Sequence, residues 1–255
     1  MERFASVDST QRVVRDWLEA GMAEVAVAIA DVQEAGRGRQ ERSWQAPPSR
    51  ALLLSAGFRP AGLAARHGWR LGAIVGLAML EAAEAVVGLP HGAIWLKWPN
   101  DIVATGPADR PLKVAGVLGE ATFDVDGNVA SAVVGIGVNV DWPATEFPPD
   151  LAEAMTSLHE LASGGRPVDR ERLLDAFLPR LDERYAALRI GRFDAGGWST
   201  RQLTTGRHVE VDAGNERFEG RAIGVDTESG ALRLKSTTGD IREFDSGEVT
   251  RCRLA

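Results

Sequence analysis

The sequence predicts an α+β protein with two parts, a mixed-sheet domain over residues 1–203 and a small β-barrel over residues 204–255. Up to Trp198, segments with helical periodicity are interspersed with short apolar segments typical of strands. After Trp198, about fifty residues hold only short alternating strands separated by glycine-containing turns, which is typical of a small barrel. A chain of 255 residues is long enough for one large domain with such an appendage.

The first elements follow from a helix-start signal and two apolar runs. Asp8 is expected to cap a helix, because Gln11 lies three residues later and apolar residues then follow at helical spacing. Gly21 is expected to end this helix. Residues 24–30 and 51–58 are each predicted to form a buried strand.

A long helix is predicted over residues 66–87, ended by Gly88 and Pro90. One of its faces is nearly bare and could lie close against a sheet, because glycines recur every four residues at Gly68, Gly72 and Gly76. A short strand is then expected at 94–97, broken by the Pro99-Asn100-Asp101 turn.

The second half is predicted to contain a hairpin of strands 114–123 and 129–140, joined by an Asp126-Gly127 turn. Helices are expected over 151–161 and 169–188, the second kinked at Pro179. The barrel strands are predicted at residues 208–212, 218–225, 231–235 and 241–244.

Composition excludes several classes of protein. The net charge of −7 and pI near 5.2 argue against broad nucleic-acid binding. A single cysteine, Cys252, excludes an intrachain disulfide and a zinc site built from cysteine pairs. The N-terminus lacks the apolar core of a signal peptide, and the longest apolar run, residues 71–80, is half the length that crosses a bilayer. We therefore expect a cytoplasmic protein that binds no membrane.

Familiar catalytic motifs are also excluded. Gly36-Arg37-Gly38 begins like a dinucleotide fingerprint, but Glu41 occupies the third glycine position. The sequence holds no P-loop and no Gly-x-Ser-x-Gly, and its four histidines and one cysteine are scattered.

The remaining candidate is an anion site around residues 36–42, a cationic segment in an acidic protein. Glycines let the backbone approach a ligand, and arginine binds phosphate or carboxylate through charge-assisted hydrogen bonds. The alternative is a mobile surface loop with solvated arginines. Polar residues at two strand ends, 97–101 and 113–116, are expected to share a cleft with this segment. Taken singly, Lys97 and Lys113 would more often be solvated lysines.

Together these segments resemble the biotin protein ligases, in the family's order and over nearly the whole chain. The matching segments are Ser9-Thr-Gln11, Gln33 to Trp44, Lys97-Trp-Pro-Asn-Asp101, Lys113 to Glu120, Gly135-Ile-Gly-Val-Asn139, Gly224-Val-Asp226, Gly230-Ala-Leu232 and Gly247-Glu-Val249. The resemblance implies a biotin/lipoyl-ligase-like catalytic domain and an SH3-like C-terminal barrel.

The resemblance also implies a two-step reaction that uses ATP and Mg²⁺. Biotin's carboxylate is joined to the α-phosphate of ATP with release of pyrophosphate, and biotin then passes to a lysine of the biotin carboxyl carrier domain of a carboxylase. Fixed cations are needed because two anions meet in the first step. The mixed anhydride must then be shielded from water, which a glycine-hinged loop bearing arginines and a tryptophan can do.

Site residues carry over position by position. The resemblance assigns the catalytic cations to Lys113, Arg37 and Arg39. The biotin-binding residues it implies are Ser9, Thr10, Gln33, Gly36, Arg37, Lys113, Gly116 and Leu118. The residues it implies near ATP or the adenylate are Arg39, Trp44, Asn100, Asp101 and Asn139, with Asp101 also near the metal.

Some positions depart from the family. Gln40 and Glu41 replace a common Arg-Gly pair, which lowers the positive charge of the loop and leaves its closure open. Cys252 stands where some members have an arginine near the nucleotide, and Arg251 or Arg253 could take that place. Members that repress transcription carry an N-terminal DNA-binding domain, whereas only eight residues precede Ser9, so we expect no DNA binding.

Two alternatives stay open at this point. One is a lipoyl- or octanoyl-handling relative on the same fold, which binding of the two acids would distinguish. The other is a non-catalytic biotin or nucleotide sensor, which would release no pyrophosphate. The acceptor carboxylase and the oligomeric state are not predicted.

Overall fold

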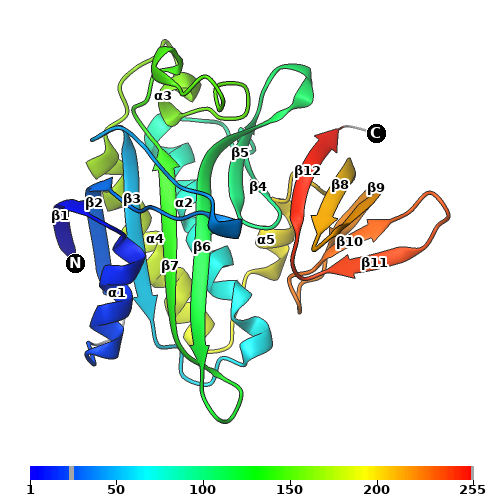
Figure 1. The fold of residues 1–255 in the computed structure, drawn as a ribbon, viewed down its shortest axis with the longest axis horizontal. Helices are drawn as coiled ribbons and strands as arrows, with labels where there is room; N and C mark the ends of the chain where they lie inside the picture. The colour runs from blue at the N-terminus through cyan, green and yellow to red at the C-terminus, as the bar shows by residue number, and fades with distance from the viewer. Residues whose placement is uncertain (23–25, 254–255) are drawn as a thin grey trace.

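The computed structural model describes residues 1–22 and 26–253 and contains two sheets (Figure 1). The larger sheet is mixed, as predicted, because β1 and β2 pair in parallel and every other neighbouring pair is antiparallel. In spatial order its seven strands are β1 (Glu2–Val7), β2 (Val27–Gln33), β3 (Ala51–Phe58), β7 (Val129–Asn139), β6 (Pro111–Phe123), β5 (Asp101–Thr105) and β4 (Ile94–Lys97).

Helices cover both faces of this sheet unequally. α1 (Thr10–Glu19) packs on β2, β3 and β7 in front of the sheet in Figure 1, where Val14 and Leu18 form a small core. The main core lies on the other face, under α2 (Trp69–Val87) and α4 (Arg170–Arg189). The short helices are α3 (Leu158–Leu161) and α5 (Ala195–Thr200). The front face is therefore left open beyond the N-terminus of α1.

The predicted bare face of α2 is confirmed. A Cβ atom added at Gly76 would lie 3.3 Å from Leu96 Cδ2, and one at Gly72 would lie 3.8 Å from Val117 Cγ1. The helix thus lies close to β4 and β6. It ends as predicted at Gly88, whose φ of 78° is a left-handed conformation that glycine adopts without strain.

The C-terminal part is a five-stranded antiparallel sheet with its own core. Its strands, in spatial order, are β11 (Ile241–Phe244), β10 (Leu232–Lys235), β9 (Glu216–Val225), β8 (His208–Ala213) and β12 (Glu248–Arg253). Within residues 204–253, β11 and β12 are edges that do not pair with each other, so the predicted barrel is not closed by backbone hydrogen bonds.

Several predicted boundaries were wrong for a tertiary reason. Ser9, not Asp8, is the N-cap of α1, and Gln11 does not complete a capping box because its amide donates to Leu118 O at 3.0 Å. The predicted helix over 151–161 is reduced to α3, because residues 154–156 pair with Lys113 of β6 instead. The strand predicted at 24–30 runs from Val27 to Gln33, and residues 23–25 lie outside the described chain.

Other elements agree with the sequence or were missed by it. The strand at 51–58 and the β6–β7 hairpin are confirmed, and α4 runs through Pro179 as one helix. β1, β5 and β12 were not predicted. β1 and β12 pair with strands that are separated from them in the chain by other elements, whereas β5 is a short strand that pairs with its chain neighbours β4 and β6. None of the helices in residues 1–22 and 26–253 is both long and apolar enough to cross a membrane.

Candidate functional site

A cavity of about 810 Å³ lies on the open front face of the large sheet, between α1, the 36–44 loop and β12. Among its described lining residues are seven cationic side chains and two carboxylates. The cationic residues are Arg37, Arg39, Arg42, Lys97, Arg110, Lys113 and Arg251, and the acidic ones are Asp101 and Glu248. In a protein of net charge −7, this is a local concentration of positive charge suited to an anion.

Strand register builds the floor of the cavity. Ser55, Gly135 and Leu118 stand side by side in one row across β3, β7 and β6, and Gly137 pairs with Gly116 in the next row. Glycine inside a strand marks a close approach of other groups. A Cβ atom at Gly137 would lie 2.5 Å from Trp44 Cε2, and one at Gly135 would lie 3.0 Å from Gln11 Cγ. Both glycines therefore let a neighbouring side chain, Trp44 or Gln11, lie directly against the strand.

One end of the cavity is a neutral hydrogen-bonded network. Thr10 Oγ1 donates to Gln33 Oε1 at 3.0 Å and shares a 2.8 Å hydrogen bond with Ser55 Oγ. Because a hydroxyl has one proton, Ser55 is the donor to Thr10. Thr10 and Ser55 are 2% and 0% exposed, so this end is buried and pre-formed. Ser9 lines the cavity beside it.

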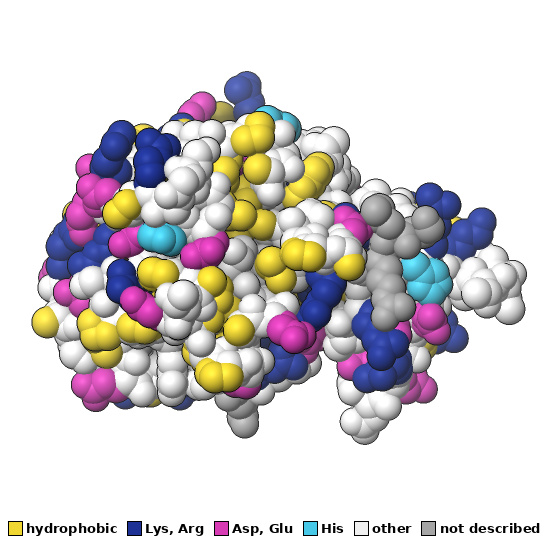
Figure 2. Space-filling model, turned by 90° about the horizontal axis from the view of Figure 1, so that it is seen from above, with side chains coloured by type: hydrophobic (Ala, Val, Ile, Leu, Met, Phe, Trp, Pro, Cys, Tyr) yellow, Lys and Arg dark blue, Asp and Glu magenta, His cyan; other side chains and the backbone are white. Residues whose placement is uncertain are grey.

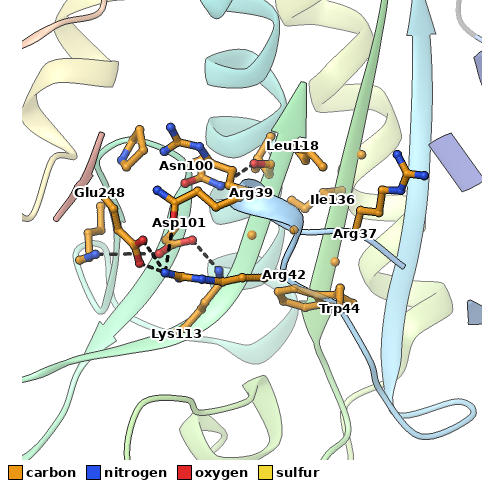
Figure 3. Close-up of a pocket in the computed structure, with 18 of the residues that line it drawn as sticks. Arg37, Arg39, Arg42, Trp44, Asn100, Asp101, Lys113, Leu118, Ile136 and Glu248 are labelled. Carbon is orange, nitrogen blue, oxygen red and sulfur yellow. Dashed lines mark hydrogen bonds and ion pairs between the residues drawn. The ribbon is translucent and has the colours of Figure 1, made fainter. Parts of the chain in front are cut away.

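The other end is formed by lysines around a carboxylate. Lys113 Nζ lies 2.7 Å from Asp101 Oδ1, and Lys97 Nζ lies 4.0 Å from Asp101 Oδ2. The Lys113 side chain runs beside Gly116, where an added Cβ would lie 3.1 Å from Nζ. Asp101 thus holds Lys113 at the junction between the glycine floor and the cationic end (Figure 3).

The segment 97–101 connects this end to the rest of the fold. Lys97 donates to Val249 O at 2.8 Å, and Asn100 Nδ2 donates to Val117 O at 2.8 Å. Trp98 is buried in the core of the C-terminal sheet, and its indole N–H donates to Gly230 O. This position of Trp98 was not predicted from the sequence. Trp98 comes from the part of the chain assigned to the first domain but packs in the core of the C-terminal sheet. The division into domains of residues 1–203 and 204–255 therefore remains a prediction.

The 36–44 loop folds back on itself over the cavity. Trp44 N–H donates to Gly36 O, and Gly38 N–H donates to Arg42 O. The turn between them passes through Gln40, whose φ of 54° is left-handed. Trp44 then lies on Gly137 and Gly116, with Lys113 Nζ 5.4 Å from the ring centroid. The side chain of Glu41 lies outside what the structure describes.

The three arginines of this loop point in different directions (Figure 3). Arg39 is directed toward the cationic end, donates to Gly247 O at 2.8 Å, and has a lowered pKa because it is partly buried. Arg42 forms two hydrogen bonds with Glu248, which raise its pKa. Arg37 is exposed and points away from Asp101 and Lys113. The structure therefore groups Arg39 with Lys113 but does not bring Arg37 to them.

The remaining predicted residues lie at varying distances from the cavity. Asn139 is buried, donates to Thr156 O at 3.0 Å, and is not among the cavity-lining residues. Gly36 is buried behind Trp44 and also does not line it. Cys252 and Arg251 both line the cavity: Cys252 is a buried thiol whose pKa is raised by burial, and Arg251 pairs with Glu210. The Arg253 side chain lies outside the described residues.

No individual role in the site was predicted for Gln11, Ser55, Arg42 or Glu248, although Arg42 lies in the predicted anion segment and Gln11 and Glu248 lie in segments that resemble the family. Ser55 sits inside an apolar strand, and the pairing of Glu248 with Arg42 joins segments about 200 residues apart. The glycines at 135 and 137 did carry a signal, since two glycines in one predicted strand indicate a close approach.

Figure 2 shows charged side chains of both signs on the two sides of the hollow between the larger and smaller parts.

Comparisons with known proteins agree with this arrangement. Residues 3–139 match the model of the biotin/lipoate A/B protein ligase family, and residues 204–250 match that of the biotin protein ligase C-terminal domain. The biotin–[acetyl-CoA-carboxylase] ligase of Mycobacterium tuberculosis is 33% identical over 89% of this chain and 79% of its own length. The ligase of the same name from Paracoccus denitrificans is 32% identical over 92% of this chain and 94% of its own.

A solved structure is also similar over the whole chain. The biotin protein ligase from Aquifex aeolicus, in complex with biotin and ATP, matches with a TM-score of 0.79 and 28% identity. The match covers 100% of this chain and 98% of that one. Both sheets are therefore part of one shared architecture.

Proposed function

The chain belongs to the biotin/lipoate A/B protein ligase family, and we propose that its 810 Å³ cavity is the place where biotin is joined to AMP and held for transfer. As a biotin ligase, it activates biotin with ATP and transfers biotin to a carboxylase carrier protein. The assignment of individual residues below is our proposal. It rests on the chemistry of the two ends of the cavity.

The neutral end takes the ureido ring of biotin. This ring carries two N–H donors and one carbonyl acceptor, so it needs a wall with both kinds of group. The Ser55–Thr10–Gln33 network, with Ser9 beside it, offers hydroxyls that can donate or accept and amide groups that do one or the other. Leu118 and Gly135 supply the flat apolar surface for the fused rings.

The cationic end takes the carboxylate and the α-phosphate. In the first step a carboxylate oxygen bonds to the α-phosphorus and the bond to pyrophosphate breaks. Lys113 and Arg39 offset the negative charge that gathers there, and Lys97 extends the positive field. In this structure Lys113 is paired with the carboxylate of Asp101. When biotin binds, Lys113 exchanges this partner for the carboxylate of biotin. In the second step the acceptor lysine amine attacks the acyl carbon, and AMP leaves.

The loop and the nucleotide side complete the assignment. Trp44 lies directly on the glycine floor, so a ligand that binds beside the indole ring is screened from water on that side. Gly36 and Gly38 let the loop turn tightly. We assign Arg37, on the exposed side of the loop, to the phosphates of ATP. Gly116 leaves room for the side chains of Lys113 and Trp44, and the valerate chain is assigned to the space beside them. Asn100 and Asn139 act at the nucleotide side by donating to backbone carbonyls of β6, Asn100 to Val117 O and Asn139 to Lys113 O.

The cavity offers Mg²⁺ few protein ligands. No group of three or more His, Cys, Asp or Glu side chains in the described chain could hold a metal, and Asp101 is already engaged by Lys113. Mg²⁺ is commonly held by one or two carboxylates together with substrate phosphates. Asp101 therefore fits the ion only as a single protein ligand to Mg²⁺ that arrives with ATP, and no step is assigned to the metal.

The observation that carries the proposal is the union of a buried neutral network and a cationic end across one glycine floor. Purified protein with biotin, ATP and Mg²⁺ should release pyrophosphate, and a biotin carboxyl carrier domain should gain the mass of one biotin. Absence of pyrophosphate release would favour the non-catalytic sensor. Lipoate or octanoate replacing biotin at equal rate would favour the lipoyl-handling relative. The C-terminal domain match favours biotin.

A further inference from the structure

The outward polar contacts of the 36–44 loop converge on one short segment of the C-terminal sheet. Among the described residues, every hydrogen bond and ion pair from residues 37–43 to the rest of the chain ends at Gly247 or Glu248. Arg39 donates to Gly247 O at 2.8 Å, and Arg42 donates to both Glu248 carboxylate oxygens at 2.7 and 2.6 Å. A third cation, Lys97, donates to Val249 O.

The segment 247–249 is more firmly held than the loop that it receives. Glu248 and Val249 pair with Asp212 and Val211 of β8. Gly247 adopts a φ of 144°, where a side chain would be strained, and an added Cβ would lie 3.0 Å from Asp212 O. The loop, in contrast, forms its backbone hydrogen bonds only within itself. The sheet is therefore the fixed partner and the loop is the moving one.

We propose that Glu248 is a positioning residue that holds the ligand-covering loop closed through Arg42. The proposal rests on the function proposed above and extends it: retention of the adenylate depends on a sheet that supplies nothing to the neutral end of the cavity. The carboxylate of Glu248 touches no reacting atom. The carboxylate fixes Arg42, and this contact keeps the loop that carries Arg39 in its closed position. Trp44, at the end of the same loop, then stays over the floor of the cavity.

The strength of this contact suits a closure that must open again. The side chain of Arg42 is 63% exposed and that of Glu248 is 28% exposed, so water and salt compete for both charges. An exposed ion pair of this kind changes an equilibrium by about threefold to fivefold. Retention of the adenylate should therefore fall by that factor, without loss of the adenylation chemistry itself.

The test compares adenylate release from the full chain and from variants. Labelled biotinyl-adenylate is formed on the enzyme, excess unlabelled biotin is added, and the release rate is followed at low and high salt. We expect Glu248→Gln and Arg42→Met each to release the adenylate about threefold to fivefold faster, with the dissociation constant of biotin within about twofold of the parent. The double variant should be no faster than either single one, because one contact is lost in each case.

The matched control is Glu171→Gln. Glu171 forms a bidentate pair with Arg3 at 2.7 and 2.5 Å, with exposures of 44% and 46%, and neither residue lines the cavity. It should release the adenylate at the parent rate. High salt should bring the parent to the rate of Glu248→Gln and should change that variant little.

The proposal is overturned if Glu248→Gln behaves like Glu171→Gln, or if the effects of the two single variants multiply in the double variant. An equal loss of biotin affinity in Glu248→Gln would also overturn it, because Glu248 would then act on the whole site. Failure of the parent to release pyrophosphate from biotin and ATP would instead contradict the proposed function, which separates the two results.

Discussion

The two ends of the cavity are held together by opposite kinds of interaction. At the neutral end, Thr10, Gln33 and Ser55 are linked by uncharged hydrogen bonds, and the first and last of them are at most 2% exposed. At the cationic end, called the loop end because the 36–44 loop covers it, Arg42 and Glu248 carry full charges, and Arg42 is 63% exposed. The first end is fixed by α1 and the neighbouring strands β2 and β3, whereas the second joins segments about 200 residues apart.

This difference separates recognition from closure. A buried hydrogen bond that is broken leaves an unsatisfied group, which costs about 1–3 kcal/mol, so the neutral end stays formed without ligand. An exposed ion pair is worth about 0.2–1 kcal/mol, so the loop end can open on each turnover. A ligase that binds a reactive intermediate needs both properties, and each end of this cavity supplies one.

The largest effect is expected at the junction of the two ends. Lys113→Ala should lower the rate of adenylate formation about a hundredfold or more, because a cation aimed at developing charge is lost. The rate is measured by pyrophosphate release. Lys235→Ala, at an exposed lysine of β10, is the control and should keep the parent rate. A Lys113→Ala variant that is as fast as the parent would remove Lys113 from the mechanism.

The second prediction tests the loop end. Arg39→Gly should raise the escape of the adenylate about tenfold, since charge-assisted hydrogen bonds contribute about 1.5–3 kcal/mol. The readout is biotin incorporated into an unrelated lysine-rich protein. Arg39→Gln separates charge from flexibility, because it loses the charge without adding a glycine. Equal loss of biotin affinity and of adenylate retention would show that Arg39 belongs to recognition, which would break the comparison.

The third prediction tests the neutral end. Thr10→Val keeps the shape of the side chain and removes the hydroxyl that connects Ser55 to Gln33. The dissociation constant of biotin should rise about fivefold, which corresponds to one lost hydrogen bond. Calorimetry measures it. The control is Thr122→Val, which removes an exposed Thr–Ser hydroxyl pair with Ser131 on the β6–β7 hairpin. An unchanged affinity in Thr10→Val would place the ureido ring elsewhere.

The smallest effect is expected in hydrogen exchange. Amides of residues 36–44 should gain roughly threefold to tenfold protection when the adenylate is added, because their closure depends on weak exposed contacts. Amides of β3, next to the neutral end, should be well protected in both states. Equal protection of the loop with and without the adenylate would mean that both ends are pre-formed.

The fold could be predicted from sequence where the signal is local. The strand at 51–58 is an unbroken run of buried residues, Gly88 ends α2, and Asp126-Gly127 turns the hairpin. The helix over 151–161 failed because residues 154–156 found a better partner in Lys113 of β6 than in their own helix. Local preference is a weak term that a distant strand overrides.

The sequence by itself determined the chemistry of the site: a glycine–arginine loop, two lysines at strand ends, and a small hydroxyl-rich helix start. These properties belong to residue types and short spacings, so they can be read without coordinates. Only the tertiary structure decided how they meet. The register of β3, β7 and β6 brings Ser55, Gly135 and Leu118 into one row, and the packing of the second sheet brings Glu248 to Arg42. These contacts between distant segments depend on the free energy of the whole packed chain. The residues next to Ser55 and Glu248 in the sequence do not indicate which distant residues the two will contact.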